Sequence, residues 1–181
     1  MKQAIGLLEF RKITCGIAAA DSMCKAASIE LLTAQAICPG KYLVMVTGDV
    51  GAVKSAVAAG TSSNTSKELV ASFVIPNLHE SVIAAIKRQN QPEALQALGV
   101  IECASVASAI VAADASAKSA PIQLLEVRLA RFMGGKAVVS LTGEVSAVQI
   151  AVEAGCRSIA DKVIDHLVLP APHKKLGTLV F

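Results

Sequence analysis

Residues 4–10 read AIGLLEF, and residues 97–103 read ALGVIEC, about half the chain further on. Other short segments on either side of this pair recur in the same order and at nearly the same spacing. These are TGDV at 47–50 with TGEV at 142–145, AG at 59–60 with AG at 154–155, and VIP at 74–76 with VLP at 168–170. Such self-similarity is the signature of a duplicated structural unit. The 181-residue sequence therefore predicts two small tandem domains, residues 1–92 and residues 93–181.

Each half predicts the order strand, helix, strand, strand, helix, strand. In the first half these elements are expected at residues 3–10, 15–28, 29–37, 41–48, 50–59 and 70–75, with a further helix at 79–88. Asp49 is expected to cap the second helix, and Gly60 to end it. A polar linker follows at residues 88–96. This order is typical of an α+β, ferredoxin-like unit with helices on one face of a sheet.

The amino-acid composition favours some classes of function and excludes others. Hydrophobic residues make up 54% of the chain, charged residues 17% and aromatic residues 3%. An apolar surplus of this kind in small domains favours oligomerisation. The net charge of +3 is too small to predict nucleic-acid binding, and the apolar stretches are too short to span a membrane. The first residues do not resemble a secretion signal, so we expect a cytoplasmic location and no membrane partner.

The cysteines do not predict a disulfide framework or a metal site within one chain. Their number is odd, their spacing is irregular and no CxxC pair occurs; they are Cys15, Cys24, Cys38, Cys103 and Cys156. The sequence also lacks Walker and dinucleotide-binding patterns. Glu9 and Glu102 end equivalent strands, and their repetition favours a structural role. We therefore do not expect an enzyme.

These segments, in this order and found twice, resemble the bacterial microcompartment shell domain. The matching pieces of the first half are AIGLLE, AADSMCKAA, VTGDVGAVKSAVAAG and VIPNLH, and those of the second half are ALGVIE, VAADASAKSA, LTGEVSAVQIAVEAG and VLPAPH. Each half begins with the AxGxxE strand and ends with the PxxH segment. The order is therefore the ordinary one, not the circularly permuted one.

The resemblance implies a location and an assembly. Single-domain members form hexamers with a central pore, and tandem members form homotrimers that imitate them as pseudohexamers. Both tile with other shell proteins around encapsulated enzymes, in a microcompartment shell within the cytoplasm. The family's edge lysine falls on Lys25 and Lys118, and we also expect His79 and His173 at tile edges. The pore loops fall on residues 37–41 and 132–136. The residues expected to line the pore are Ile37, Cys38, Pro39, Gly40, Met133, Gly134 and Gly135.

Cys38, followed by Pro39 and Gly40, resembles the first pore loop of the T-type shell proteins of propanediol-utilisation microcompartments. That resemblance implies a [4Fe–4S] cluster held on the threefold axis by one Cys38 from each chain. It would serve electron transfer across the shell, with encapsulated redox enzymes as possible partners. Soft thiolates suit iron–sulfur chemistry, and symmetry would supply three of them. Met133 is the pseudo-equivalent of Cys38, and we expect it to line the pore only.

Simpler interpretations stay open. Cys38 taken alone is an ordinary free thiol, which would leave a plain pore for small metabolites. The pairs Asp21–Lys25 and Asp114–Lys118 have the spacing of ordinary i,i+4 helix pairs. A different class is a soluble ligand-binding or regulatory protein built from two ferredoxin-like domains.

Overall fold

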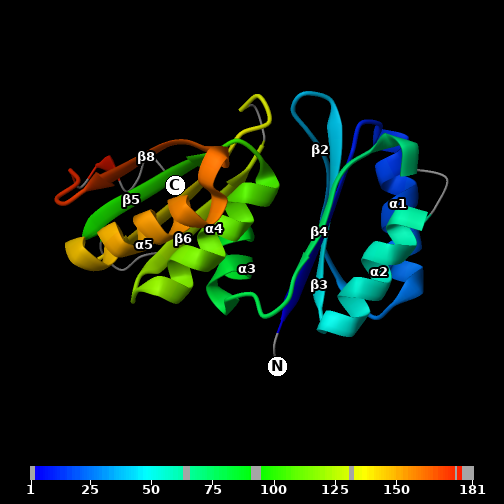
Figure 1. Cartoon of the computed structure of the whole chain (residues 1–181), viewed down its shortest axis with the longest axis horizontal. Coiled ribbons are helices and arrows are strands. Elements are labelled where there is room, and N and C mark those ends of the chain that lie inside the picture. The colour runs from blue at the N-terminus through cyan, green and yellow to red at the C-terminus, as the bar shows by residue number, and fades with distance from the viewer. Residues whose placement is uncertain (1–2, 63–65, 91–94, 131–132, 174, 177–181) are drawn as a thin grey trace. The chain divides into compact units, whose positions relative to one another are not determined.

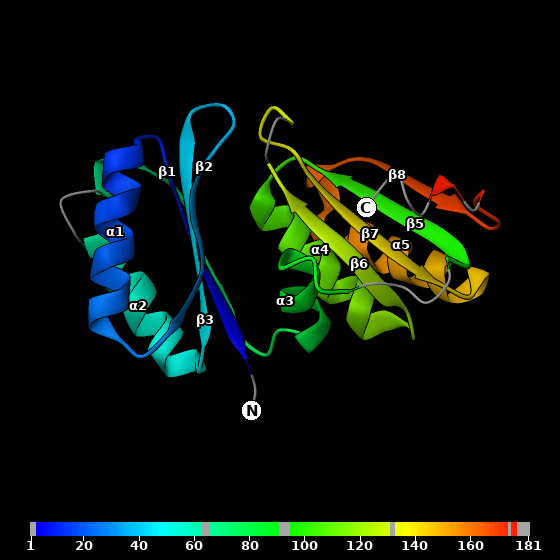
Figure 2. The same cartoon turned by 180° about the vertical axis from the view of Figure 1, so that it is seen from behind.

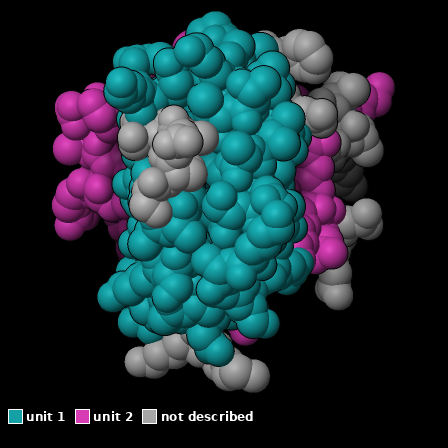
Figure 3. Space-filling view, turned by 90° about the vertical axis from the view of Figure 1, so that its right-hand side faces the viewer, with its two compact units in different colours: residues 1–78 teal, residues 79–181 magenta. Residues whose placement is uncertain are grey.

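The computed structural model describes residues 3–62, 66–90, 95–130, 133–173 and 175–176. They form two compact units, residues 1–78 and residues 79–181, which Figure 3 colours separately. Phe132 of the expected second pore loop lies outside the described residues. Among the described residues, no helix combines the length and the apolarity needed to cross a membrane.

Unit 1 is a four-stranded antiparallel sheet covered by two helices. Its elements are β1 (Ala4–Phe10), α1 (Ile13–Ala26), β2 (Glu30–Ile37), β3 (Lys41–Gly48), α2 (Val50–Ser62), the short 3-10 helix η1 (Ser66–Glu68) and β4 (Leu69–Ile75). The strand order is β2-β3-β1-β4, and α1 and α2 lie side by side on one face (Figure 1). The core lies between sheet and helices, where Leu8, Met23 and Val53 are completely buried.

Unit 2 repeats this architecture and adds one helix at its beginning. Its elements are α3 (Glu80–Ile86), β5 (Ala97–Cys103), α4 (Val106–Ser119), β6 (Gln123–Leu129), β7 (Ala137–Gly143), α5 (Val145–Ile159), the 3-10 helix η2 (Ala160–Lys162) and β8 (Val163–Leu169). The strand order β6-β7-β5-β8 reproduces that of unit 1. The predicted α+β fold with two tandem domains is therefore confirmed, and so is the non-permuted element order.

Helix α3 makes the compact units differ from the expected ranges 1–92 and 93–181. In the sequence, α3 comes directly after β4, the last strand of the first repeat. In the structure, however, α3 packs against β6 and α4 and belongs to unit 2 (Figure 2). Its apolar side does this packing, with Val82 and Ala85 completely buried. The structural division therefore falls between Leu78 and His79, ahead of the polar segment expected to be the linker.

The expectation that Gly60 ends its helix is wrong. Helix α2 continues through Gly60 to Ser62. A Cβ at Gly60 would lie 2.5 Å from Leu8 Cδ1 and 2.8 Å from Met23 Cγ, both in the core. The glycine is required because the helix approaches the sheet and α1 closely, not because the backbone leaves the helix there.

Substituting Gly60→Ala is expected to destabilise unit 1, because the added methyl must displace two fully buried side chains, at a cost of about 1–3 kcal/mol. Gly51→Ala is the matched control on the same helix. A Cβ at Gly51 meets nothing within 4 Å, so the better helix propensity of alanine should stabilise by up to about 1 kcal/mol. Thermal denaturation followed by circular dichroism compares them, and equal melting temperatures would contradict the close-packing account.

Candidate functional site

The first expected pore loop is a tight hairpin tip. Residues 38–40 form the turn, and Ile37 faces Lys41 as the last register pair of β2 and β3. Ile37 is buried beneath the tip, Cys38 is half-buried, and Pro39 and Gly40 are exposed. Gly40 has φ 71°, a left-handed conformation that glycine adopts without a steric penalty. The Cys38–Pro39 peptide is cis. The hairpin therefore presents a thiol near the surface on a short turn.

The second expected pore loop is longer. Strand β6 ends at Leu129 and β7 begins at Ala137. A turn closes where the Lys136 N–H donates to the Met133 carbonyl at 3.1 Å, and Gly134 and Gly135 have φ of 61° and 91°. Met133 is half-buried and Gly134 is exposed. The two loops thus share a position in the fold and differ in length and chemistry.

An ion pair stands at the base of each loop, which sequence reasoning did not predict. Lys41 Nζ lies 2.6 Å from Glu9 Oε1, and Lys136 Nζ lies 2.9 Å from Glu102 Oε1. The Glu9 side chain is only 6% exposed, and this lysine is the opposite charge that accompanies its burial. The sequence signal was the joint repetition of the Gly-Lys pair and of the strand-ending glutamate. A structural role was expected for the two glutamates, and in the structure each one pairs with the lysine beside a loop.

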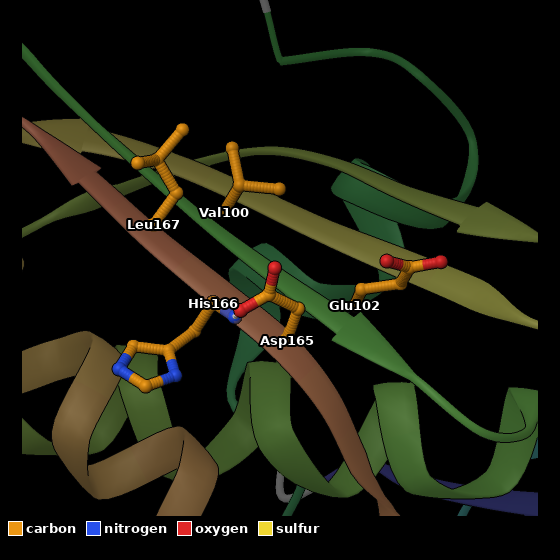
Figure 4. Close-up of a pocket in the computed structure, with 5 residues that line it drawn as sticks. All are labelled: Val100, Glu102, Asp165, His166 and Leu167. Carbon is orange, nitrogen blue, oxygen red and sulfur yellow. Dashed lines mark hydrogen bonds between the residues drawn. The ribbon is translucent and has the colours of Figure 1, made fainter.

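A shallow acidic pocket lies on the sheet of unit 2 (Figure 4). Strand partners Glu102 and Asp165 bring two carboxylates to it, and Val100 and Leu167 form its apolar side. His166 points away from the other four side chains. In unit 1 the residue facing Glu9 is Ala71, so this second carboxylate is particular to the second repeat. The pocket therefore combines a mainly apolar floor with two carboxylates beside the Lys136–Glu102 pair.

The residues expected at tile edges fall into two groups. Lys25 bonds Asp21 and Lys118 bonds Asp114, each at 2.6 Å, which confirms both i,i+4 pairs. The lysine side chains are 74% and 44% exposed respectively. His79 instead caps α3, since the Ser81 N–H donates to its Nδ1 at 3.3 Å.

The other cysteines lie in the body of each unit. Cys24 is exposed and Cys15 is half-buried. Burial raises the pKa of the Cys103 thiol to about 12, with smaller contributions from Cys156 and Glu102, and burial also raises the pKa of Cys156. Among the described residues, one chain does not gather three or more His, Cys, Asp or Glu side chains into a group able to hold a metal ion.

The BMC-domain family model matches residues 4–78 and, a second time, residues 97–172. The chain therefore belongs to the BMC-domain family of bacterial microcompartment shell proteins. It is 43% identical to the bacterial microcompartment shell protein PduT of Citrobacter freundii over 178 residues, which cover 97% of this chain and 96% of that relative. The shell protein PduA of Salmonella typhimurium is 40% identical over 82 residues, which cover 45% of this chain and 87% of PduA.

Solved structures agree with this assignment. The crystal structure of a microcompartment protein from Desulfitobacterium hafniense DCB matches with a TM-score of 0.94 and 42% identity, covering 98% of this chain and 99% of that one. A fused permuted hexameric shell protein of the RMM microcompartment matches with a TM-score of 0.62 at 21% identity, which shows a shared fold only. The protein is thus a structural shell protein built from two tandem domains.

The part-buried Lys41–Glu9 pair is expected to stabilise unit 1 more than the exposed Lys25–Asp21 helix pair. Lys41→Met leaves the Glu9 carboxylate buried without its partner, which should cost about 1–3 kcal/mol. Lys25→Met removes an exposed pair and should change stability by at most about 0.5 kcal/mol. Denaturant unfolding of dilute protein measures both, and similar losses would contradict a role for Glu9 in anchoring the hairpin.

Thiol labelling should follow burial. Alkylation requires the thiolate, and with its pKa at about 12, Cys103 stays protonated and covered at pH 8. Cys24, which is exposed, should react first with iodoacetamide in native protein, and Cys103 only after denaturation. Peptide mass spectrometry with time gives the order. Labelling of native Cys103 as fast as Cys24 would contradict the buried position.

Proposed function

We propose that the protein is a trimeric shell tile whose threefold pore holds a [4Fe–4S] cluster through Cys38. The observation that carries this proposal is the half-buried thiol on a three-residue hairpin turn. The resemblance to shell domains assigns this turn to the pore. Near-full-length similarity to PduT supports the tandem type of shell protein.

Domain number supports the proposed trimer. PduA corresponds to about half of this chain, so one chain supplies two domains where a single-domain shell protein supplies one. Three chains then provide six domains in a ring that is threefold symmetric and pseudo-sixfold in shape. Such a tile would join other shell proteins through its edges, where Lys25 and Lys118 carry exposed ammonium groups on long apolar stems.

The donor set suits the cluster when it is counted over three chains. One chain offers one pore thiol, and threefold symmetry brings three soft donors to one point, enough for three irons of a cubane. The fourth iron would take a ligand from elsewhere. When bound, the cluster would supply one-electron transfer between the interior, where redox enzymes are the expected partners, and the exterior. Pro39 and Gly40 would border the opening beside it, with Met133, Gly134 and Gly135 of the second loop.

Cys38→Ser is expected to abolish iron binding and to leave the trimer intact, because the thiol lies on a turn outside the core. Protein purified without oxygen should contain iron and absorb broadly near ~400 nm. Cys24→Ser, an exposed cysteine on α1, is the matched control and should keep both signals. Iron analysis, absorption and light scattering give the three readouts.

A trimer that stays colourless and free of iron after anaerobic reconstitution would overturn the cluster and leave a shell tile with a plain metabolite pore. Equal iron loss in both cysteine variants would also overturn it. Electron microscopy of concentrated protein separates both shell functions from a discrete soluble regulator, since only a tile forms extended sheets.

A further inference from the structure

Unit 2 contains two cysteines, Cys103 and Cys156, at positions that unit 1 fills with other residues. Their repeat partners are Phe10 and Thr61, since AIGLLEF aligns with ALGVIEC and the Ala-Gly pair at 59–60 aligns with the pair at 154–155. Phe10 is completely buried in the core between the sheet and the helices of unit 1, and Cys103 is completely buried as well. Cys103 therefore faces the helices of unit 2, as Phe10 faces those of unit 1.

Helix α5 lies along β5 and runs in the same direction (Figure 1). A Cβ added at Gly99 would lie 2.8 Å from Val152 Cγ2. Two residues further along the strand, Ile101 meets the helix about one turn later, because a Cβ added at Gly155 would lie 2.6 Å from Ile101 Cδ1. Side chains two residues apart on a strand share a face. The next side chain of this face, Cys103, therefore meets the final turn of α5, which follows Gly155.

Cys156 points from that turn toward the sheet. It follows Val152 by four residues, and residues four apart lie on the same side of a helix. Val152 is 1% exposed, and Cys156 is half-buried. Burial is the main cause of the raised pKa of Cys103, and the charge of Cys156 adds to it, which requires the two sulfur atoms to lie near each other. The Cys103 thiol is held only by a weak hydrogen bond of 3.8 Å to the Ile101 carbonyl, so it is free to turn toward its neighbour.

We propose that Cys103 and Cys156 form an oxidation site, in which hydrogen peroxide converts the two thiols into a disulfide that joins β5 to α5. Both thiols are free, and among the described residues no third His, Cys, Asp or Glu joins them in a metal-binding group. The pair therefore suits a reversible thiol–disulfide change better than a metal ion. The site lies wholly in unit 2, so it is independent of the proposed cluster on Cys38 and of the proposed trimer.

The different burial of the two thiols gives them different parts in the reaction. Cys156 is the less covered and meets the peroxide: its thiolate attacks one oxygen, the O–O bond breaks, and the departing hydroxide takes up the proton that Cys156 lost and leaves as water. The Cys103 sulfur then attacks the sulfur of the Cys156 sulfenic acid. This step forms the S–S bond, breaks the S–O bond and releases a second water, which carries the Cys103 proton. The two thiols lose two electrons, and one peroxide becomes two waters.

The disulfide would close the chain between residues 103 and 156, a segment that contains α4, β6 and β7. A cross-link over so long a segment stabilises a protein chiefly by restricting its unfolded chain, and a dithiol reductant reverses it. Oxidation would therefore make unit 2 harder to unfold. Unit 1 lacks this response, because Phe10 and Thr61 occupy the equivalent positions.

The test uses the full chain with Cys15→Ser, Cys24→Ser and Cys38→Ser, which leaves Cys103 and Cys156 alone and removes the proposed iron ligand. The folded protein is treated with hydrogen peroxide at mildly alkaline pH, because the pKa of Cys156 is raised by burial and its thiolate is scarce at neutral pH. The intact chain should lose two hydrogen atoms, and digestion without reductant should give one linked peptide containing both cysteines. The midpoint of urea unfolding should rise and should return to its starting value with dithiothreitol.

Two controls accompany this measurement. Cys156→Ser in the same background should give no linked peptide and no change in the urea midpoint, and its Cys103 should stay a thiol because it is covered. The parent chain oxidised after unfolding in urea should give the linked peptide, which shows that the peptide is detected when it forms.

Three outcomes would overturn the proposal. The first is oxidation of Cys156 to sulfinic acid while Cys103 stays free, and the second is a link that forms only between chains. The third is a linked chain that is no more resistant to urea than the reduced chain, because the folded state would then not hold the two sulfur atoms together. A folded chain that gives no link, under conditions that oxidise Cys24 of the unsubstituted protein, would overturn it equally.

Discussion

The packing of α3 on α4 and β6 is the interaction on which the organisation of this chain depends. A four-stranded sheet with two helices on one face leaves a flank of its first helix and edge strand uncovered. In unit 2 this flank is closed by α3, whose Val82 and Ala85 are completely buried and whose preceding residue, His79, is tied to Asp114. Unit 2 is therefore completed by a helix that precedes its own repeat in the sequence.

The sequence was sufficient for the repeat, the strands and the turns, because these depend on local patterns. AIGLLEF and ALGVIEC became central strands β1 and β5, and the turn at residues 38–40 lies where proline and glycine placed it. Tertiary contacts explain the differences. A glycine that lets α2 approach Leu8 looks, in sequence, like a glycine that ends a helix, so Gly60 was assigned wrongly. The helix after β4 carries no local sign that it packs on the next unit.

In the candidate site, too, the sequence predicts features set by neighbouring residues but not contacts between residues far apart in the chain. Position 38 is set by the hairpin, so sequence could place its thiol on a loop. The pairing of Lys41 with Glu9 depends on β1 lying beside β3, which only the folded sheet shows. This pair contributes more than charge balance, since a nearly buried carboxylate at the base of a two-stranded tip holds the lysine close to the sheet. The thiol is consequently presented by an anchored hairpin.

Because the domain is duplicated within one chain, its two loops can carry different residues, which is impossible in a ring of identical single domains. In a hexamer of identical domains a cysteine at the pore loop would appear six times, more than one cubane cluster can bind. Here the first loop carries Cys38 on a three-residue turn, and the second is longer and carries Met133, Gly134 and Gly135. The same lysine–glutamate ion pair stands at the base of both loops, so the two loops differ in their residues but share this anchoring contact. A trimer of this chain would present three thiols in a ring of six loops, which supply three of the four ligands that the proposed cluster requires.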